Sequence, residues 1–458
     1  MDWSVGQFGD ARLDNSGAAL LEQMAVRKTV CLKRIGGARD GELRAGRFFG
    51  HENVTAGKII DGWGEKTGAA AAGRHVLAIQ DTAKVTFKTT EGRRRGLGPV
   101  GKGNIYGLLA HVMIAVDADT QALLGLVDGD VWNREGTVDT PHHKRTLENR
   151  ESSRWLDTAA RAKRVLEPAA MVTVVADRES GIYAEWATIP EDRFHVLTRA
   201  MVDRTLAGPA GGTLFAAAAA FPLAGTARIE IPARQPDRAK RTSTVEMRFG
   251  EVEIVRPHNE KDRTLPGSVR LRLVEVREID APDGVEPIHW RLLTTHAVAD
   301  AKTAWQIVAW YRIRWVIEQL FRVMKTQGLN VEESRLTTAG RLMKLVAMAV
   351  KAACLDMLLV QEREGKHGLP AAIVFSEPEI DTIEALVPIL EGKTDRQRNP
   401  HPPRGLARAA WVMARLGGWN CYYAPPGPIT MRRGRERFRA MHEGRLLGSI
   451  MEQDMRLG

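Results

Sequence analysis

The feature that most constrains the fold is a repeated pattern in which a short apolar run ends at an aspartate. Val76–Ile79 is followed by Asp81, and Val172–Val175 is followed by Asp177. Short, continuous apolar runs of this kind are typical of strands buried on both faces of a sheet. In open α/β sheets, functional acids gather where such strands end. We therefore expect both aspartates just past the ends of buried strands, where they are candidates for chemistry.

The order of the surrounding segments indicates a mixed α/β core. Two β-like stretches, at 105–117 and 121–132, are joined by "DADTQ", which predicts a hairpin, and 148–167 has the periodicity of a helix. Three stretches between 205 and 288 then alternate apolar and polar residues at period two, which predicts an antiparallel sheet inserted into the core. "HWRLLTT" is expected to return to the main sheet, and helices are expected from about 301 to 363.

The charge of the chain favours a polyanionic partner. Lysine and arginine number 66 against 56 aspartates and glutamates, which gives a net charge of +10. A balance of this size points to nucleic acid more than to membrane, although a basic enzyme of another class stays open. Residues 27–47 include seven basic residues and only two acids. A DNA-contacting domain and a solvated helical face are both possible interpretations of this stretch.

Cysteine usage and hydropathy bear on the compartment. The three cysteines are odd in number and far apart, which favours a reduced, cytoplasmic protein without a disulfide framework. We expect no signal peptide, because the first residues carry early acids and no apolar core. The most apolar long stretch is interrupted by Lys351 and Asp356, so a buried helix is expected there and no association with a membrane.

The stretch "YRIRWVIEQLFRVMK" has an unusual polar face. Wound as a single helix, it sets large apolar residues on one side. The opposite, polar side carries one carboxylate among cations and a phenol, and its residues are Tyr311, Arg314, Glu318, Arg322 and Lys325. An ion-pair ladder worth a few tenths of a kcal/mol per pair would explain this face. Alternatively, Glu318 joins Asp81 and Asp177 at divalent metal ions, and the cations hold phosphate.

The spacing of these residues resembles a family signature. Tyr311-x2-Arg314-x3-Glu318-x6-Lys325 matches at all four positions the YREK signature of a branch of bacterial cut-and-paste insertion-sequence transposases of the DDE type. "LAIQDT" and "ADRESGI" resemble the first and second acidic motifs of that family. Trp290 in "HWRLLT" resembles the tryptophan that stabilises a flipped base in this branch. The likeness runs over nearly the whole chain, with "GDARL" and "ARLGG" near its two ends.

The resemblance implies a ribonuclease-H-like (retroviral-integrase-like) catalytic core with a β-rich insertion and flanking helical domains. The expected boundaries are a DNA-binding domain at 1–68, the first part of the core at 69–204, the insertion at 205–288, the second part of the core at 289–363, and a helical dimerisation region at 364–458. It also implies double-stranded DNA as partner, both element ends and target, and a homodimer in the synaptic complex. A bacterial cytoplasmic location, on the nucleoid when DNA-bound, is expected.

The resemblance further implies a reaction and residue roles. The reaction uses Mg²⁺, for which Mn²⁺ can substitute; it cuts the element ends, forms and opens a hairpin, and joins the ends to target DNA. Asp81, Asp177 and Glu318 are expected as metal ligands, and Tyr311, Arg314, Arg322, Lys325, Trp290 and Arg199 as DNA contacts. Three alternatives stay open: a DNA-binding protein without catalysis, a nuclease of the same fold that does not rejoin DNA, and a glycosidase with a pair of carboxylates.

Overall fold

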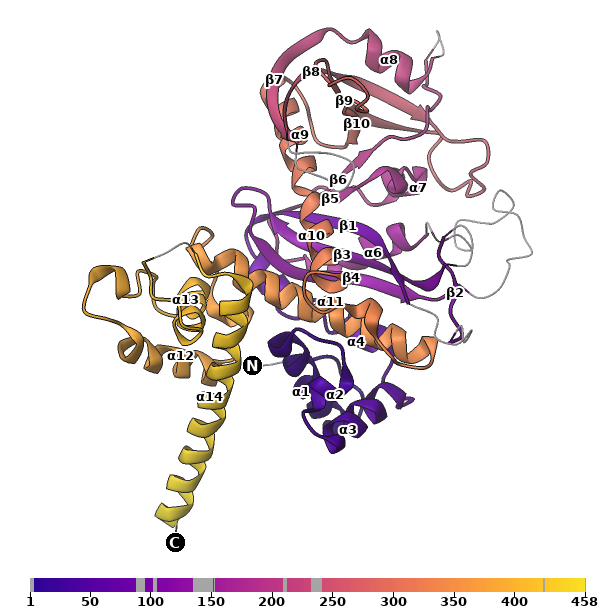
Figure 1. Ribbon diagram of the computed structural model, residues 1–458. Helices are drawn as coiled ribbons and strands as arrows, with labels where there is room; N and C mark the ends of the chain where they lie inside the picture. The colour runs from indigo at the N-terminus through magenta and orange to yellow at the C-terminus, as the bar shows by residue number, and fades with distance from the viewer. Residues whose placement is uncertain are drawn as a thin grey trace. The chain divides into compact units, whose positions relative to one another are not determined.

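The computed structural model describes residues 4–87, 95–101, 105–134, 151, 153–208, 212–231, 241–422 and 425–457. The chain divides into two compact units (Figure 1). The first comprises Met1–Ala71, Thr82–Gly136 and Glu318–Gly458, and the second comprises Ala72–Asp81 and Thr137–Ile317. Strand β1 (His75–Thr86) and helix α10 (Trp315–Lys325) each contribute residues to both units.

Three parallel strands form the centre of the second unit. The first half of β1 pairs with β5 (Met171–Ala176), and β5 pairs with β6 (Phe194–Arg199). Val76–Ile79 and Val172–Val175 are buried throughout, as predicted for these runs. Helices α6 (Ser153–Val165) and α7 (Tyr183–Thr188) and the 3-10 turn η3 (Arg178–Ser180) connect these strands.

Antiparallel strands extend this sheet. Strand β10 (His289–Thr294) pairs with β6 on one side and with β9 (Ser268–Glu278) on the other. The order continues through β8 (Arg241–Val255) to β7 (Leu223–Ile231), with α8 (Leu214–Ala220) beside β8. The sheet of the second unit is therefore mixed. The predicted antiparallel strands and the return of 289–294 to the main sheet are both confirmed.

The position of Asp81 differs from the prediction. Asp177 follows the last residue of β5 as predicted, but Asp81 lies inside β1, which continues to Thr86. Beyond the acid the burial pattern changes from continuous to alternating, with Ala83 and Val85 buried and Lys84 exposed. A strand with one exposed face is still a strand. The end of the apolar run therefore marks where burial on both faces ends, and the strand itself goes on.

The stretch from Tyr311 to Lys325 is two helices, which corrects the prediction of one. Helix α9 (Ala301–Ile313) ends at the cap residue Arg314, and α10 starts at Trp315. The backbone N–H of Arg314 donates to the carbonyl of Tyr311 at 3.1 Å, and that of Ile317 donates to the carbonyl of Arg314 at 3.2 Å. Bonds that span three residues tighten the helix locally, so the winding changes at Arg314.

The first unit is mainly helical around one hairpin. Strands β3 (Tyr106–Asp117) and β4 (Leu123–Trp132) form that hairpin, and the short β2 (Gly98–Pro99) pairs with β3. Asp117 closes the predicted turn by accepting the backbone N–H groups of Asp119 and Thr120 at 2.9 and 2.8 Å. The hairpin is preceded by the helices α1 (Ala11–Arg27), α2 (Leu32–Gly36), α3 (Arg39–Gly50), α4 (Ala56–Asp61) and α5 (Thr67–Ala71).

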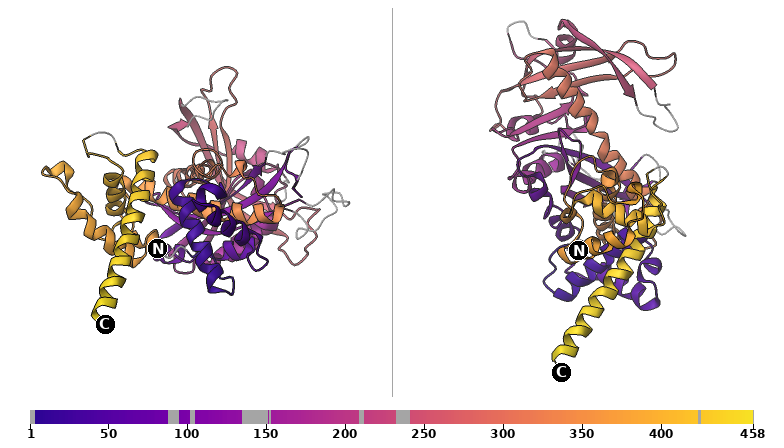
Figure 2. Two further views of the ribbon diagram at one scale, coloured as in Figure 1. Left: turned by 60° about the horizontal axis from the view of Figure 1, so that its bottom comes forward. Right: turned by 90° about the vertical axis from the view of Figure 1, so that its left-hand side faces the viewer.

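The long helix α11 (Ala339–Gln361) is the core element of the first unit and contacts β4 and α1. Its Asp356 accepts from Lys28, the C-cap residue of α1, at 2.8 Å and from the buried Arg435 at 3.4 Å. Helices α12 (Glu377–Leu390), α13 (Leu406–Leu416) and α14 (Pro428–Leu457) follow, and the C-terminal half of α14 extends beyond α12 and α13 (Figure 2). Short 3-10 helices lie at Val331–Glu333, Glu362–Glu364, Ala371–Ile373 and Asp395–Gln397.

Across the residues placed by the structure, we find no helix with the length and apolar character required to cross a bilayer.

Candidate active site

Two of the three predicted acids lie side by side in the second unit. The parallel register of β1 and β5 runs from His75 opposite Met171 to Gln80 opposite Ala176. Asp81 is the next residue of β1 and Asp177 is the residue that follows β5, and both are partly exposed. Parallel pairing therefore brings two carboxylates from segments far apart in the sequence to one edge of the buried core.

Each aspartate is held by a defined partner. Asp81 Oδ2 accepts from a guanidinium nitrogen of Arg314 at 3.1 Å, in a pair whose side chains are about one-sixth exposed (16% and 17%). Asp177 Oδ1 accepts the backbone N–H of Glu179 at 2.8 Å and so caps the turn η3. Arg314, the residue at the junction of α9 and α10, is therefore the one that contacts Asp81.

Tyr311 lies among four of the other predicted residues. Its ring is buried and meets the Trp290 ring edge to face, with centroids 5.5 Å apart and planes at 65°. Arg199, Arg314 and Asp177 lie close enough to its hydroxyl to act on it electrostatically. Burial, with a contribution from Asp177, raises the pKa of Tyr311, although both arginines act to lower it. The phenol is therefore neutral at physiological pH and available as a hydrogen-bond donor.

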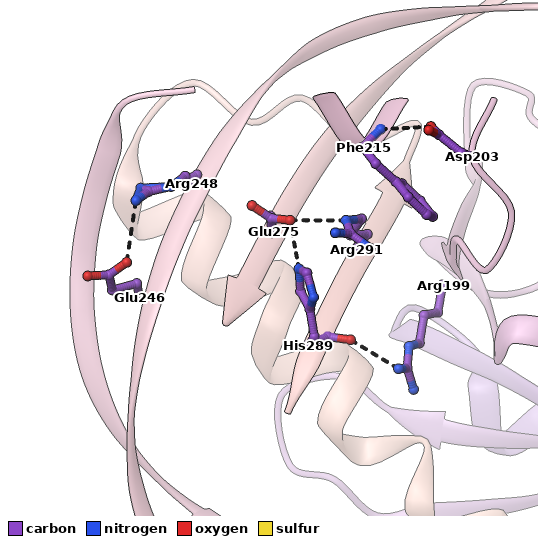
Figure 3. Close-up of polar contacts among 8 residues, drawn as sticks. All are labelled: Arg199, Asp203, Phe215, Glu246, Arg248, Glu275, His289 and Arg291. Carbon is purple, nitrogen blue, oxygen red and sulfur yellow. Dashed lines mark hydrogen bonds and ion pairs between the residues drawn. The ribbon is translucent and has the colours of Figure 1, made fainter. Parts of the chain in front are cut away.

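Strand β10, which carries Trp290, is anchored on its other side. Glu275 Oε1 is 2.8 Å from His289 Nε2 and accepts from Arg291 Nε at 3.0 Å (Figure 3). Arg199 donates to the carbonyl of His289 at 3.0 Å, as the same figure shows. Because successive side chains of a strand point to opposite faces, these bonds leave Trp290 directed to the face of Tyr311.

The remaining predicted residues belong to α10 in the first unit. Glu318 and Arg322 are exposed on that helix. Lys325 Nζ donates to the carbonyl of Lys84 at 2.6 Å and lies 3.4 Å from Glu332 Oε1. Glu332 also accepts the backbone N–H and the hydroxyl of Thr86 at 2.9 and 3.1 Å. Lys325 is therefore fixed against the second half of β1.

The second unit brings together six of the predicted residues: Asp81, Asp177, Arg199, Trp290, Tyr311 and Arg314. The other three, Glu318, Arg322 and Lys325, lie together on α10 in the first unit. The two aspartates supply the oxygen ligands that hard divalent cations prefer, so the donor set fits a metal such as Mg²⁺. Within the described ranges, however, no three His, Cys, Asp or Glu side chains are grouped as a metal site.

Besides Glu332, two glutamates of the second unit near this region were not predicted. Glu275 occupies a polar position of an alternating strand, where nothing in the pattern distinguishes it from a solvated residue. Glu185 is completely buried in α7, between Ala184 and Trp186. A single acid inside the apolar turn "YAEWA" is an unusual placement, and that is the signal by which Glu185 could have been found.

Comparison with known protein families agrees with this geometry. A family model described as "Transposase DDE domain" matches residues 73–355, a segment that contains both aspartates, Trp290 and all four residues of the Tyr-Arg-Glu-Lys motif. The chain belongs to this family of DDE transposases. It is therefore an enzyme of DNA transposition, which acts on DNA, and enzymes of this kind generally use divalent metal ions.

Proposed function

We propose that this protein cuts DNA at the ends of a mobile element and joins those ends to target DNA, with Asp81, Asp177 and Glu318 as its metal-binding acids. The observation that carries the proposal is the pairing of β1 with β5, which makes Asp81 and Asp177 neighbours inside the segment matched by the family model. Glu318 is proposed as the third acid because it lies in the same segment and keeps the signature spacing from Tyr311 and Arg314.

The acids, as ligands of Mg²⁺ or Mn²⁺, would hold the scissile phosphate for in-line attack. A pair of such ions, when bound, activates the attacking oxygen and stabilises the leaving one. Arg314, now paired with Asp81, would exchange that carboxylate for a phosphate oxygen, since guanidinium binds both anions in the same geometry. This exchange would couple the arrival of DNA to the release of Asp81 for metal binding.

The aromatic pair suits a displaced base. Trp290 is partly exposed and rests against Tyr311, which supports its ring from the side. Stacking of a flipped base on an aromatic ring is worth about 1–3 kcal/mol. We propose that Trp290 takes a base extruded near the cleavage point, that Tyr311 and Arg199 contact the adjoining phosphates, and that Arg322 and Lys325 extend these contacts along α10.

The wider proposal follows the family resemblance. It includes a ribonuclease-H-like core, for which support comes from the parallel strands β1, β5 and β6 and the β3–β4 hairpin. It also includes a hairpin DNA intermediate, a DNA-contacting role for residues 1–68, and dimerisation through 364–458 in the synaptic complex. Two copies would place one site at each element end.

The test uses purified protein, DNA from both flanks of its gene, and a supercoiled target, with Mg²⁺, Mn²⁺ or EDTA. Metal-dependent end cleavage and joining are expected. Glu318→Gln should reduce both by at least about a thousandfold, because removal of a metal ligand removes transition-state stabilisation, and DNA retardation should be unchanged. Glu364→Gln, at an exposed glutamate after α11, is the matched control.

Other outcomes select the alternatives. DNA retardation without cleavage under any condition would make the protein a binding module. Cleavage without joined products would make it a nuclease of the same fold. Cleavage that persists in Glu318→Gln would remove that residue from the catalytic set and leave α10 with an ion-pair role.

A further inference from the structure

A buried acid connects the two chain segments that carry Asp81 and Asp177. Glu185 of α7 is fully enclosed in the second unit. Its Oε1 accepts from the side-chain amide of Gln80 at 2.9 Å, and its Oε2 accepts from the hydroxyl of Ser180. Both partners are themselves fully buried.

Gln80 and Ser180, the two partners of Glu185, lie close in the sequence to Asp81 and Asp177. Gln80 immediately precedes Asp81 on β1, and Ser180 lies three residues after Asp177, at the end of the turn that Asp177 caps. One carboxyl group therefore joins the end of the buried part of β1 to the turn that follows β5. Backbone pairing between the two strands stops at Gln80 and Ala176, so Glu185 supplies a side-chain link just where the ladder ends.

Keeping an acid in this place is costly. Burial raises the pKa of Glu185 to about 7, even though the hydrogen bonds from Ser180 and Gln80 act to lower it. An apolar side chain of similar size would avoid that desolvation cost. A methionine would fill the same space beside Trp186, but it could not hold Gln80 or Ser180.

We propose that Glu185 is a positioning residue that fixes the spacing of Asp81 and Asp177 by holding Gln80 and Ser180 together. The inference rests on the proposed function for its catalytic meaning, although the link itself is a property of the fold. Catalytic groups must be held within about 0.5 Å of their working geometry, and a displacement of about 1 Å can reduce a rate a hundredfold. Loss of the link should therefore reduce the rate of cleavage and leave DNA affinity unchanged.

The experiment compares the whole wild-type protein with Glu185→Met, Glu185→Gln and the control Glu191→Met, which removes a glutamate whose side chain is 60% exposed. Hydrogen–deuterium exchange is followed at 80–82 and 178–181, and single-turnover cleavage and DNA affinity are measured with Mg²⁺. In Glu185→Met, exchange in both segments should be about tenfold faster and cleavage about 10–100-fold slower, with DNA affinity within about twofold of wild type.

The conservative variant separates positioning from packing. Glutamine can accept from Gln80 and donate to Ser180, so Glu185→Gln should recover wild-type exchange and come within about threefold of the wild-type rate. If Glu185→Met fails to fold, Ser180→Ala serves in its place, because it removes one of the two hydrogen bonds. It should show the same local exchange pattern with a smaller loss of rate.

Each result has one meaning. Unchanged exchange in both segments would overturn the inference, as would faster exchange with an unchanged rate of cleavage. A wild-type protein that does not cleave DNA would overturn the proposed function instead. In that case the exchange data would still decide whether Glu185 holds the two strands together.

Discussion

At the scale of single residues, the candidate site is distinguished by how its charged groups are paired. Asp81 is matched by Arg314, and the neutral phenol of Tyr311 stands between Arg199, Arg314 and Asp177. A neutral donor among two cations and an acid can bond an anion without adding charge of its own. The hydroxyl of Tyr311 is therefore the group whose removal tests the arrangement most cleanly.

Tyr311→Phe should reduce the rate of DNA cleavage by about 10–100-fold, the loss expected when a hydrogen bond to a charged group is removed. The thermal midpoint should change little, because the ring keeps its contact with Trp290. Single-turnover cleavage with Mg²⁺, together with thermal melting, measures both quantities. An unchanged rate would show that the phenol packs in the core without contacting DNA.

At the scale of elements, the two faces of β10 make different contacts. One face presents Trp290 to Tyr311, and the other is tied to β9 by Glu275. Burial alone raises the pKa of Glu275, but the hydrogen bonds and charges of His289 and Arg291 outweigh it and hold that pKa below its ordinary value. The carboxylate is therefore ionised at physiological pH and fixes the strand on which Trp290 sits.

Glu275→Ala should destabilise the second unit by about 1–3 kcal/mol, because the side chains of His289 and Arg291 lose a carboxylate partner that is only 8% exposed. Glu246→Ala is the matched control, since Glu246 pairs with Arg248 on the same sheet, where both side chains are more than a quarter exposed (Figure 3). That change should cost about 0–1 kcal/mol. Chemical denaturation measures both, and equal costs would contradict the anchoring role.

At the scale of the molecule, the second unit contains a histidine cluster whose protonation opposes folding. His296 Nε2 is 2.7 Å from the hydroxyl of Thr173, which also contacts His75 at 2.8 Å, and the rings of His195 and His296 are stacked at 3.9 Å. Burial, with the nearby His195 and His75, lowers the pKa of His296 to about 3. His296 is therefore neutral in the folded protein throughout the physiological range.

This cluster predicts acid sensitivity of a definite sign. The neutral His296 ring contributes fully to the free energy of unfolding above its ordinary pKa of 6.5. This contribution is lost as the pH falls from 6.5 towards 3, because in that range the histidine is protonated in the unfolded chain but not in the folded protein. Between pH 7.5 and 5.5 the loss should be about 1 kcal/mol. Denaturation at both values should show a loss that is smaller by about 1 kcal/mol in His296→Gln than in wild type and in the exposed-site control His258→Gln, because His195 and other histidines with lowered pKa values still contribute. A His296→Gln slope equal to wild type would contradict this account.

Much of the fold could be predicted because local periodicity follows burial. The continuous runs before Asp81 and Asp177 and the alternating runs of β7, β8 and β9 all appear as strands. The end of β1, in contrast, was placed too early. In β1, the apolar run reports where two-sided burial ends and carries no information about where pairing ends.

The sequence by itself determined the chemistry available to this protein: two acids that follow buried apolar runs, a cationic motif at fixed spacing, and the pattern that identifies a DDE transposase. Only the tertiary structure decided which groups meet. The pairing of Asp81 with Arg314, the turn at Arg314 that divides α9 from α10, and the link from Glu185 to Gln80 and Ser180 all depend on contacts between distant segments. The physical reason is that spacing along the chain reports local geometry, whereas burial and hydrogen-bond partners are set by the packing of the whole unit.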